Sequence, residues 1–162
     1  MFKKILVPLD GSKLAAKILP FVVDLAKTHD SQVTLLHTYY AGVSESFPEW
    51  IAEALEKEKQ NCEIFLARVA EDLEAQGLTG VKSVCLEGYP AVEIIDYAKD
   101  NGIDLIAMST HGRGEVAWVL GSVAEKVVAH ATVPVLLFRV MASKLLQTKE
   151  EYFEEVLDRG IP

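Results

Sequence analysis

The chain has 162 residues, of which 50% are hydrophobic and 25% are charged, and its formal net charge is −8. This composition is typical of one globular domain, large enough to bury roughly two-thirds of the surface of its unfolded chain. The negative charge argues against nucleic-acid binding, because Lys and Arg are scattered along the chain. No apolar run approaches the ~20 residues that span a bilayer, so we expect neither nucleic acid nor a membrane as a partner.

The two cysteines, Cys62 and Cys85, bear on the cellular compartment. They have no metal-type spacing and form no disulfide framework, which favours a reducing interior and a Cys85 that is simply packed within a strand. The N-terminus leads from Met1 directly into an apolar strand, without the pattern of a secretory signal. These features predict a cytoplasmic protein.

In the first half of the chain, strand-length apolar runs alternate with helical patterns, which is typical of a parallel α/β sheet. A first strand is predicted at residues 5–9, and Ser12 is placed to cap one helix that continues through Leu25. A second strand is predicted at residues 33–39. A long, charged amphipathic helix is then expected at about residues 50–75.

The second half continues the alternation. A third strand is predicted at residues 81–86, and Pro90 is placed to start the next helix. A buried fourth strand is predicted at residues 103–108. After a glycine-bearing loop and another helix, a last strand begins at Val133 and ends at Phe138.

Five strands with four helical connections predict a single doubly wound α/β domain with helices on both faces of the sheet. Ligands of such sheets bind outside the carboxyl ends of the strands, where the strand order reverses. For the order 3-2-1-4-5 this point lies between strands one and four. The loops at residues 8–12 and 109–112 would therefore meet there.

The segment after the fourth strand suits a phosphate. Residues 109–114 read Ser-Thr-His-Gly-Arg-Gly, and Gly121-Ser122 precede a helix. Glycines let backbone N–H groups approach an anion, and a helix N-terminus aims unpaired donors at it. The loop matches neither the P-loop pattern nor the three-glycine dinucleotide fingerprint.

Several segments resemble universal stress protein domains of the UspA type. Residues 3–12, Lys-Lys-Ile-Leu-Val-Pro-Leu-Asp-Gly-Ser, resemble the opening of these domains, and residues 109–114, 121–127 and 133–136 resemble their ending. The similarity covers the chain from Met1 to about Arg139. It implies the strand order 3-2-1-4-5, homodimers that pair through the last strand, and in one branch ATP bound in the crevice.

The ATP-binding branch carries G-x2-G-x9-G-[ST] after strand four. By resemblance, Gly112 matches the second glycine, Gly121 the third and Ser122 the terminal hydroxyl. The resemblance also assigns Asp10 to the ribose, Val7 and Thr38 to backbone contacts around adenine, and Val123 to a phosphate-contacting N–H. The candidate nucleotide-binding residues are Val7, Pro8, Asp10, Thr38, Met108, Ser109, Gly112, Gly121, Ser122 and Val123.

Two departures from this pattern stand out. Ser109 occupies the position of the first glycine, which is a mild change if its φ is negative. Eight residues instead of nine separate Gly112 from Gly121, which shortens the arm that carries Gly121 and Ser122 to the phosphates.

Each candidate also has a purely structural interpretation. Asp10 can simply hydrogen-bond the turn that follows strand one, as Asp often does. Gly121 and Ser122 can simply mark the start of a helix, with Ser122 as its N-cap. His37 is expected to be a satisfied core residue, and His111 a structural or phosphate-neighbouring residue without metal ligands at suitable spacing.

We therefore expect a stress-response regulatory module, not an enzyme, that binds ATP or another adenine nucleotide, with Mg²⁺ as an optional companion. The chain has no nucleophile-elbow or zinc-protease motif. It also shows no recognisable set of catalytic residues for slow ATPase or kinase activity. The module would be a homodimer acting on an unknown protein partner. The alternative is an interaction dimer that no longer binds nucleotide.

The end of the chain lies beyond the resemblance. We expect the nucleotide-binding domain at residues 1–140 and a C-terminal helical extension at residues 141–162. Apolar residues such as Phe153 and Leu157 alternate there with acidic ones in an amphipathic pattern. The extension is expected to dock on its own dimer or on the partner subunit, because apolar stripes rarely stay in water.

The shortened loop predicts weak discrimination among AMP, ADP and ATP. The missing residue between Gly112 and Gly121 threatens contacts to the outer phosphates but not contacts to the nucleoside. Each phosphate contact is a charge-assisted hydrogen bond worth about 1.5–3 kcal/mol. Calorimetry should therefore show ATP binding less than about tenfold tighter than AMP, a gap below about 1.4 kcal/mol. Inserting one residue after Gly114 should sharpen the preference for ATP. A larger wild-type gap would contradict the prediction.

Overall fold

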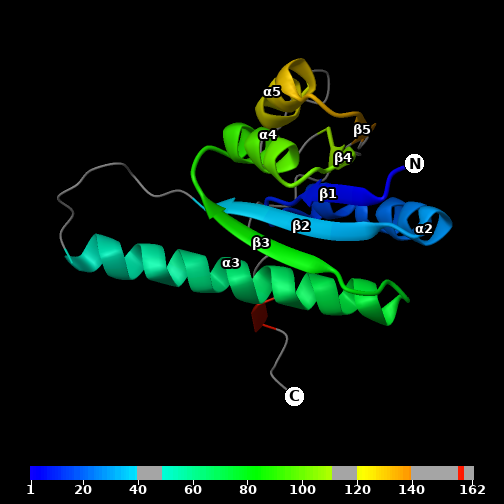
Figure 1. The fold of residues 1–162 in the computed structure, drawn as a ribbon. Coiled ribbons are helices and arrows are strands. Elements are labelled where there is room, and N and C mark those ends of the chain that lie inside the picture. The colour runs from blue at the N-terminus through cyan, green and yellow to red at the C-terminus, as the bar shows by residue number, and fades with distance from the viewer. Residues whose placement is uncertain (40–48, 111–119, 140–156, 159–162) are drawn as a thin grey trace, which may run out of the picture.

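The computed structural model describes residues 1–39, 49–110, 120–139 and 157–158. The sheet has five parallel strands in the order β3-β2-β1-β4-β5 (Figure 1). The strands are β1 (Lys4–Pro8), β2 (Gln32–Tyr39), β3 (Lys82–Glu87), β4 (Leu105–Ser109) and β5 (Val135–Phe138). The helices are α1 (Lys13–Ala16), α2 (Leu19–His29), α3 (Glu49–Ala75), α4 (Pro90–Asp100) and α5 (Ser122–His130). The predicted fold class and strand order are confirmed.

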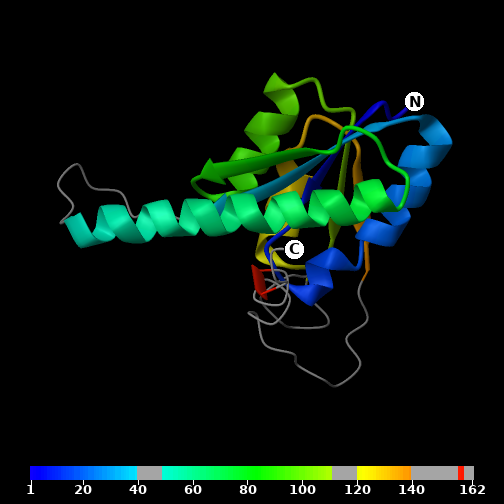
Figure 2. The same cartoon turned by 90° about the horizontal axis from the view of Figure 1, so that it is seen from below.

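Helices cover both faces of the sheet. Figure 1 shows α4 and α5 on one side and α2 and α3 on the other, and Figure 2 shows α3 running along the second face beside α2. Successive β1 residues alternate between the two layers: Ile5 and Val7 pack with α2 and α3, whereas Leu6 packs with α4 and α5. These three side chains are fully buried, which explains the uninterrupted apolarity of the strand.

The single helix predicted after β1 is wrong, because the structure divides it into α1 and α2. Pro20 stands in the first turn of α2. A proline lacks the N–H that would bond to the carbonyl four residues earlier, here that of Ala16, and its ring clashes with that carbonyl. The predicted cap is confirmed, since the Ser12 hydroxyl accepts from the Ala15 amide at 3.0 Å.

The expectation that the two cysteines stay unpaired is also wrong. Cys62 of α3 and Cys85 of β3 form a disulfide, with Cα atoms 6.1 Å apart. Their sequence separation gave no recognisable pattern, but α3 connects β2 to β3 and packs back across both strands. That crossover places the two residues face to face, so the cysteines give no argument for a reducing compartment.

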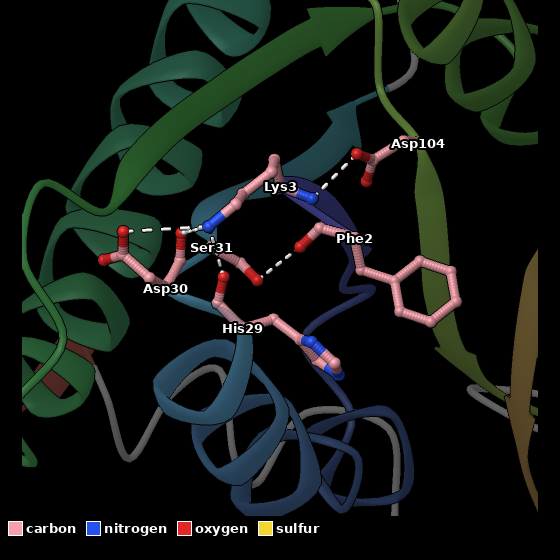
Figure 3. A network of polar contacts seen from close by, with 6 residues as sticks. All are labelled: Phe2, Lys3, His29, Asp30, Ser31 and Asp104. Atoms are coloured by element: carbon pink, nitrogen blue, oxygen red, sulfur yellow. Dashed lines mark hydrogen bonds and ion pairs between the residues drawn. The ribbon is translucent and has the colours of Figure 1, made fainter.

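The amino edge of the sheet is held by a polar network (Figure 3). The Asp104 carboxylate accepts from the backbone amides of Lys3 at 2.7 Å and Lys4 at 3.1 Å, which joins the start of β1 to that of β4. The Lys3 ammonium donates to the His29 carbonyl at 2.6 Å, where α2 ends. A cation there satisfies a terminal carbonyl and complements the helix dipole. This edge lies opposite the carboxyl ends of the strands and serves the fold.

Most of the predicted C-terminal extension lies outside the described residues. Leu157 is half-buried and packs against the core between the sheet and α2 and α3. No helix in the described part of the chain is long and apolar enough to cross a membrane.

The disulfide should contribute measurably to stability. A cross-link spanning 23 residues stabilises a fold by about 3 kcal/mol, mainly by restricting the unfolded chain. Reduction should therefore lower the free energy of unfolding in urea by about that amount. The Cys62→Ala/Cys85→Ala variant serves as the control, since its unfolding should not respond to reductant. A wild-type protein with the same stability in both redox states would contradict this prediction.

Candidate functional site

A cavity of about 280 Å³ opens at the carboxyl edge of the sheet, where the strand order reverses between β1 and β4. Its lining comes from the ends of β1, β2 and β4, from the loop after β1, and from the first turns of α4 and α5. Eight of the candidate residues lie in this lining: Pro8, Asp10, Thr38, Met108, Ser109, Gly121, Ser122 and Val123. That they contact a ligand remains a prediction.

Two candidates do not line the described cavity. Val7 is fully buried in β1, one residue before the lining begins at Pro8. Gly112 lies outside the described residues, as does His111.

Asp10 combines its structural role with a place in the cavity wall. Its Oδ1 accepts hydrogen bonds from the Ser12 amide at 2.9 Å and the Ser12 hydroxyl at 2.6 Å. Gly11, between them, has a φ of 81°, a conformation that favours glycine, so the sequence Asp-Gly-Ser fits this tight turn. The turn therefore holds the carboxylate in the lining of the cavity through its two bonds to Ser12.

Ser109 also contributes to the framework. It ends β4 and is not in the loop that the sequence suggested, and its hydroxyl donates to the Ala15 carbonyl at 3.1 Å. Its φ is not positive, so replacing the family's glycine with serine leaves the backbone unstrained. The hydroxyl therefore ties β4 to α1 below the cavity.

The first turn of α5 is the main source of backbone donors in the cavity. Gly121 is the N-cap, with φ −57° and ψ 144°, so the interpretation of Ser122 as the N-cap is wrong. No side chain caps this helix in the described part of the chain. The first three helical residues, Ser122, Val123 and Ala124, all line the cavity, and their amides precede the first intrahelical donor, that of Glu125.

The segment that precedes α5 is closed by a backbone hydrogen bond. The Gly121 amide donates to the Thr110 carbonyl at 2.9 Å, and the Thr110 amide donates to the Phe138 carbonyl at 2.9 Å. These two bonds hold the ends of β4 and β5 and the start of α5 together. The Gly121 N–H is consequently engaged within the protein.

His37 is a satisfied core residue, as expected, but it also lines the cavity. It is buried, its Nδ1 donates to the Leu9 carbonyl at 2.7 Å, and its ring packs edge-on against Phe65 at 5.8 Å. That one side chain serves both roles could not be predicted from the sequence, because Leu9 and Phe65 are distant from His37 in the chain.

The sequence also missed an apolar wall from α4. Pro90 and Ile94 line the cavity, together with Leu36 of β2. The sequence predicts Pro90 only as the start of the helix that follows the third strand. Any such helix start after a parallel strand lies at the carboxyl edge, so the position of Pro90 was an available signal.

The electrostatics of the cavity are simple. Among the described lining residues, Asp10 is the acidic side chain and none is Lys or Arg. Tyr39, which follows Thr38, has a pKa raised by burial and further by the negative charge of Glu87, so its phenol stays neutral near pH 7. The described site offers one carboxylate, backbone donors and apolar walls, which suits binding of a polar ligand with an apolar ring.

Comparison with known proteins agrees with this architecture. Residues 1–139 match the model of the universal stress protein family. The universal stress protein MJ0531 of Methanocaldococcus jannaschii is 34% identical over 145 residues, which cover 86% of this chain and 83% of the relative. The solved structure of MJ0577, also from that organism, has a TM-score of 0.79 at 32% identity and covers 88% of this chain and 99% of its own.

A more distant structure shares the fold. The universal stress protein from Archaeoglobus fulgidus in complex with dAMP has a TM-score of 0.58 at 23% identity, covering 85% of this chain and 98% of its own. From the match over residues 1–139 and the identity to MJ0531, the chain belongs to the universal stress protein family.

Proposed function

We propose that the protein binds an adenine nucleotide in the cavity between β1 and β4, and that occupancy regulates an unknown protein partner. The observation that carries the proposal is the first turn of α5, whose residues Ser122, Val123 and Ala124 line the same cavity as Asp10 and which no side chain of the described residues caps. An N-terminal helical turn binds phosphate through its N–H groups and dipole. A carboxylate accepts hydrogen bonds from the hydroxyls of a ribose.

The remaining lining suits the base. Pro8, Leu36, Ile94 and Met108 supply apolar surface against which an aromatic ring can pack. The A. fulgidus relative is described in complex with dAMP, which makes an adenine nucleotide the first ligand class to test. At about 280 Å³ the described cavity lies near the lower end of the usual range for small-molecule sites.

Binding without rapid turnover is the proposed mode of action. Phosphoryl transfer requires a base or water-orienting group and a charge clamp near the transferred group. The described lining offers one carboxylate, engaged with Ser12, and one imidazole, engaged with Leu9. Mg²⁺ enters the proposal only as a companion of the phosphates, because one carboxylate in the cavity does not by itself make a metal cage.

A bound nucleotide would act by joining the two loops that meet where the strand order reverses, between β1 and β4. A nucleotide held by both the Asp10 turn and α5 links segments that follow β1 and β4. At a hundred times its dissociation constant, a ligand stabilises the bound state by about 2.7 kcal/mol. We place this function in the cytoplasm, where adenine nucleotides are abundant.

Gly121→Val should abolish the thermal shift that AMP or ATP gives the wild type. The added side chain stands at the N-cap of α5, beside the proposed phosphate site, while the φ of −57° at this position is open to valine. Differential scanning fluorimetry with and without nucleotide measures the effect.

The matched control is Ala129→Val, which adds the same bulk to an exposed position of the same helix. It should retain the shift. An unchanged shift in Gly121→Val would remove α5 from the site. A wild type that shows no shift and carries no nucleotide on purification would favour the alternative, an interaction dimer without nucleotide.

We also propose that the chain is a homodimer through the strand from Val133 to Phe138. In the described sheet β5 pairs with β4 on one side only. Leu136 is 41% exposed. Phe138 packs against the half-exposed Phe21 of α2, with ring centroids 4.3 Å apart. An apolar edge strand invites pairing with another chain, and two-fold symmetry is the commonest closed arrangement.

Leu136→Lys should yield monomer or aggregate by light scattering, because a charge at the interface opposes pairing. Ile64→Lys is the matched control: Ile64 of α3 is 44% exposed, comparable to Leu136, and α3 packs on β2 and β3 at the other edge of the sheet. The control should remain dimeric. A wild type that is monomeric at micromolar concentration would contradict the proposal.

A further inference from the structure

The Cys62–Cys85 disulfide lies next to a residue of the cavity. In the parallel pairing of β2 with β3, Cys85 is the direct partner of His37. Laterally paired residues of neighbouring strands project to the same face of the sheet. The disulfide therefore lies against the side of His37 that faces α3.

The helix end of the disulfide reaches the same histidine. Phe65 follows Cys62 by three residues in α3, so the two side chains share a face of the helix. The Phe65 ring packs edge-on against His37 with centroids 5.8 Å apart, and both Cys62 and Phe65 are fully buried. His37 is thus held between the strand and the helix that the disulfide joins.

His37 in turn fixes the loop that carries Asp10. A carbonyl oxygen only accepts, so the 2.7 Å contact identifies Nδ1 of His37 as a donor to Leu9. The Leu9 amide donates to the Leu36 carbonyl at 2.8 Å, so β2 holds both polar groups of this residue. Asp10 is the next residue and begins the turn that ends at Ser12.

We propose that Cys62–Cys85 is a reversible redox site that acts through His37 on the Asp10 loop, with a small-molecule or protein dithiol as its reductant. Cys85 is half-buried on the edge strand whereas Cys62 is fully buried, so the reagent attacks Sγ of Cys85. The S–S bond breaks, and Cys62 leaves as a thiolate and takes up a proton. The second thiol of the reagent then attacks the mixed disulfide and releases Cys85.

The exchange is balanced, because the protein gains two electrons and two protons and the dithiol becomes a disulfide. Two unbonded sulfur atoms need more separation than bonded ones, and a close-packed interior transmits that displacement to its neighbours. Among the described strands β3 pairs only with β2, so this edge of the sheet can yield. The displacement of the sulfur atoms shifts Phe65 and His37, so the Leu9 carbonyl loses its hydrogen bond from Nδ1 of His37.

The cytoplasmic location proposed above gives this chemistry a context. Cytosolic disulfides are rare, and those that occur are usually transient and catalytic or redox-sensing. The affinity measurement below rests on the proposed function, whereas the exchange measurement does not.

Amide hydrogen exchange in the ligand-free protein tests the link directly. Reduction by dithiothreitol should accelerate exchange of the Leu9 and Ser12 amides at least tenfold more than that of the Ile106 amide. Ile106 donates to the Pro134 carbonyl on the β5 side of the sheet and serves as the internal control. Equal acceleration at all three sites, no change, or free thiols after aerobic purification would overturn the inference.

The affinity for AMP, measured by calorimetry, is the second test of the redox link. Reduction should raise the dissociation constant at least fivefold, and Cys62→Ala/Cys85→Ala should bind as the reduced protein does, with no further response to dithiothreitol. Equal affinity in the two redox states would overturn the inference while leaving the proposed function intact. Oxidised protein that binds no AMP would overturn the proposed function, and the exchange arm would still decide the redox link.

Two substitutions of His37 test the relay in the oxidised protein. His37→Asn keeps a side-chain N–H near the position of Nδ1, whereas His37→Gln moves the amide one carbon farther out. The Leu9 and Ser12 amides should exchange at wild-type rates in His37→Asn and at the faster rates of the reduced protein in His37→Gln. Equal rates in the two variants would show that the hydrogen bond to Leu9 is not the relay.

Discussion

The burial of β1 on both faces is the constraint on which the remaining structure depends. Ile5, Leu6 and Val7 are fully buried, and the strand pairs with β2 on one side and β4 on the other. A strand buried this completely cannot be an edge, so the chain must place strands on both sides of it. The order therefore reverses at β1, and the loops that leave β1 and β4 part toward opposite faces. The cavity is the space between them.

Several polar side chains around that cavity are engaged in hydrogen bonds within the protein. Ser109 binds the Ala15 carbonyl, Ser12 binds Asp10, and His37 binds Leu9. Each of these bonds fixes a loop, so few side-chain groups at the site are independent of the framework. In the proposed function, the phosphates are bound by the backbone of the first turn of α5. The described donors of this turn are preorganised, because they belong to a helix that is already formed.

The sequence predicted the elements that depend on periodicity. The alternation of apolar runs and helical patterns predicted five strands, the resemblance to a known family supplied their order, and Asp10, Gly121 and Ser122 were correctly expected at one edge. The features that it missed depend on the crossing of distant segments. Pro20 and Pro90 were the exceptions, because the effect of Pro20 on α1 and α2 and the place of Pro90 at the carboxyl edge were available from the chain alone. The Cys62–Cys85 pair, the contact of His37 with Leu9 and the wall at Ile94 exist only after α3 and α4 have packed on the sheet.

The hydrogen bond between the Gly121 amide and the Thr110 carbonyl anchors the first turn of α5 directly to the end of β4. The residue before residues 111–120 is thereby joined to the residue after them, so the two ends of that segment are held together. The entropy of closing such a loop changes only slowly with its length. The entropic cost of this closure is therefore nearly the same for the present segment as for one with the additional residue of the G-x2-G-x9-G-[ST] pattern.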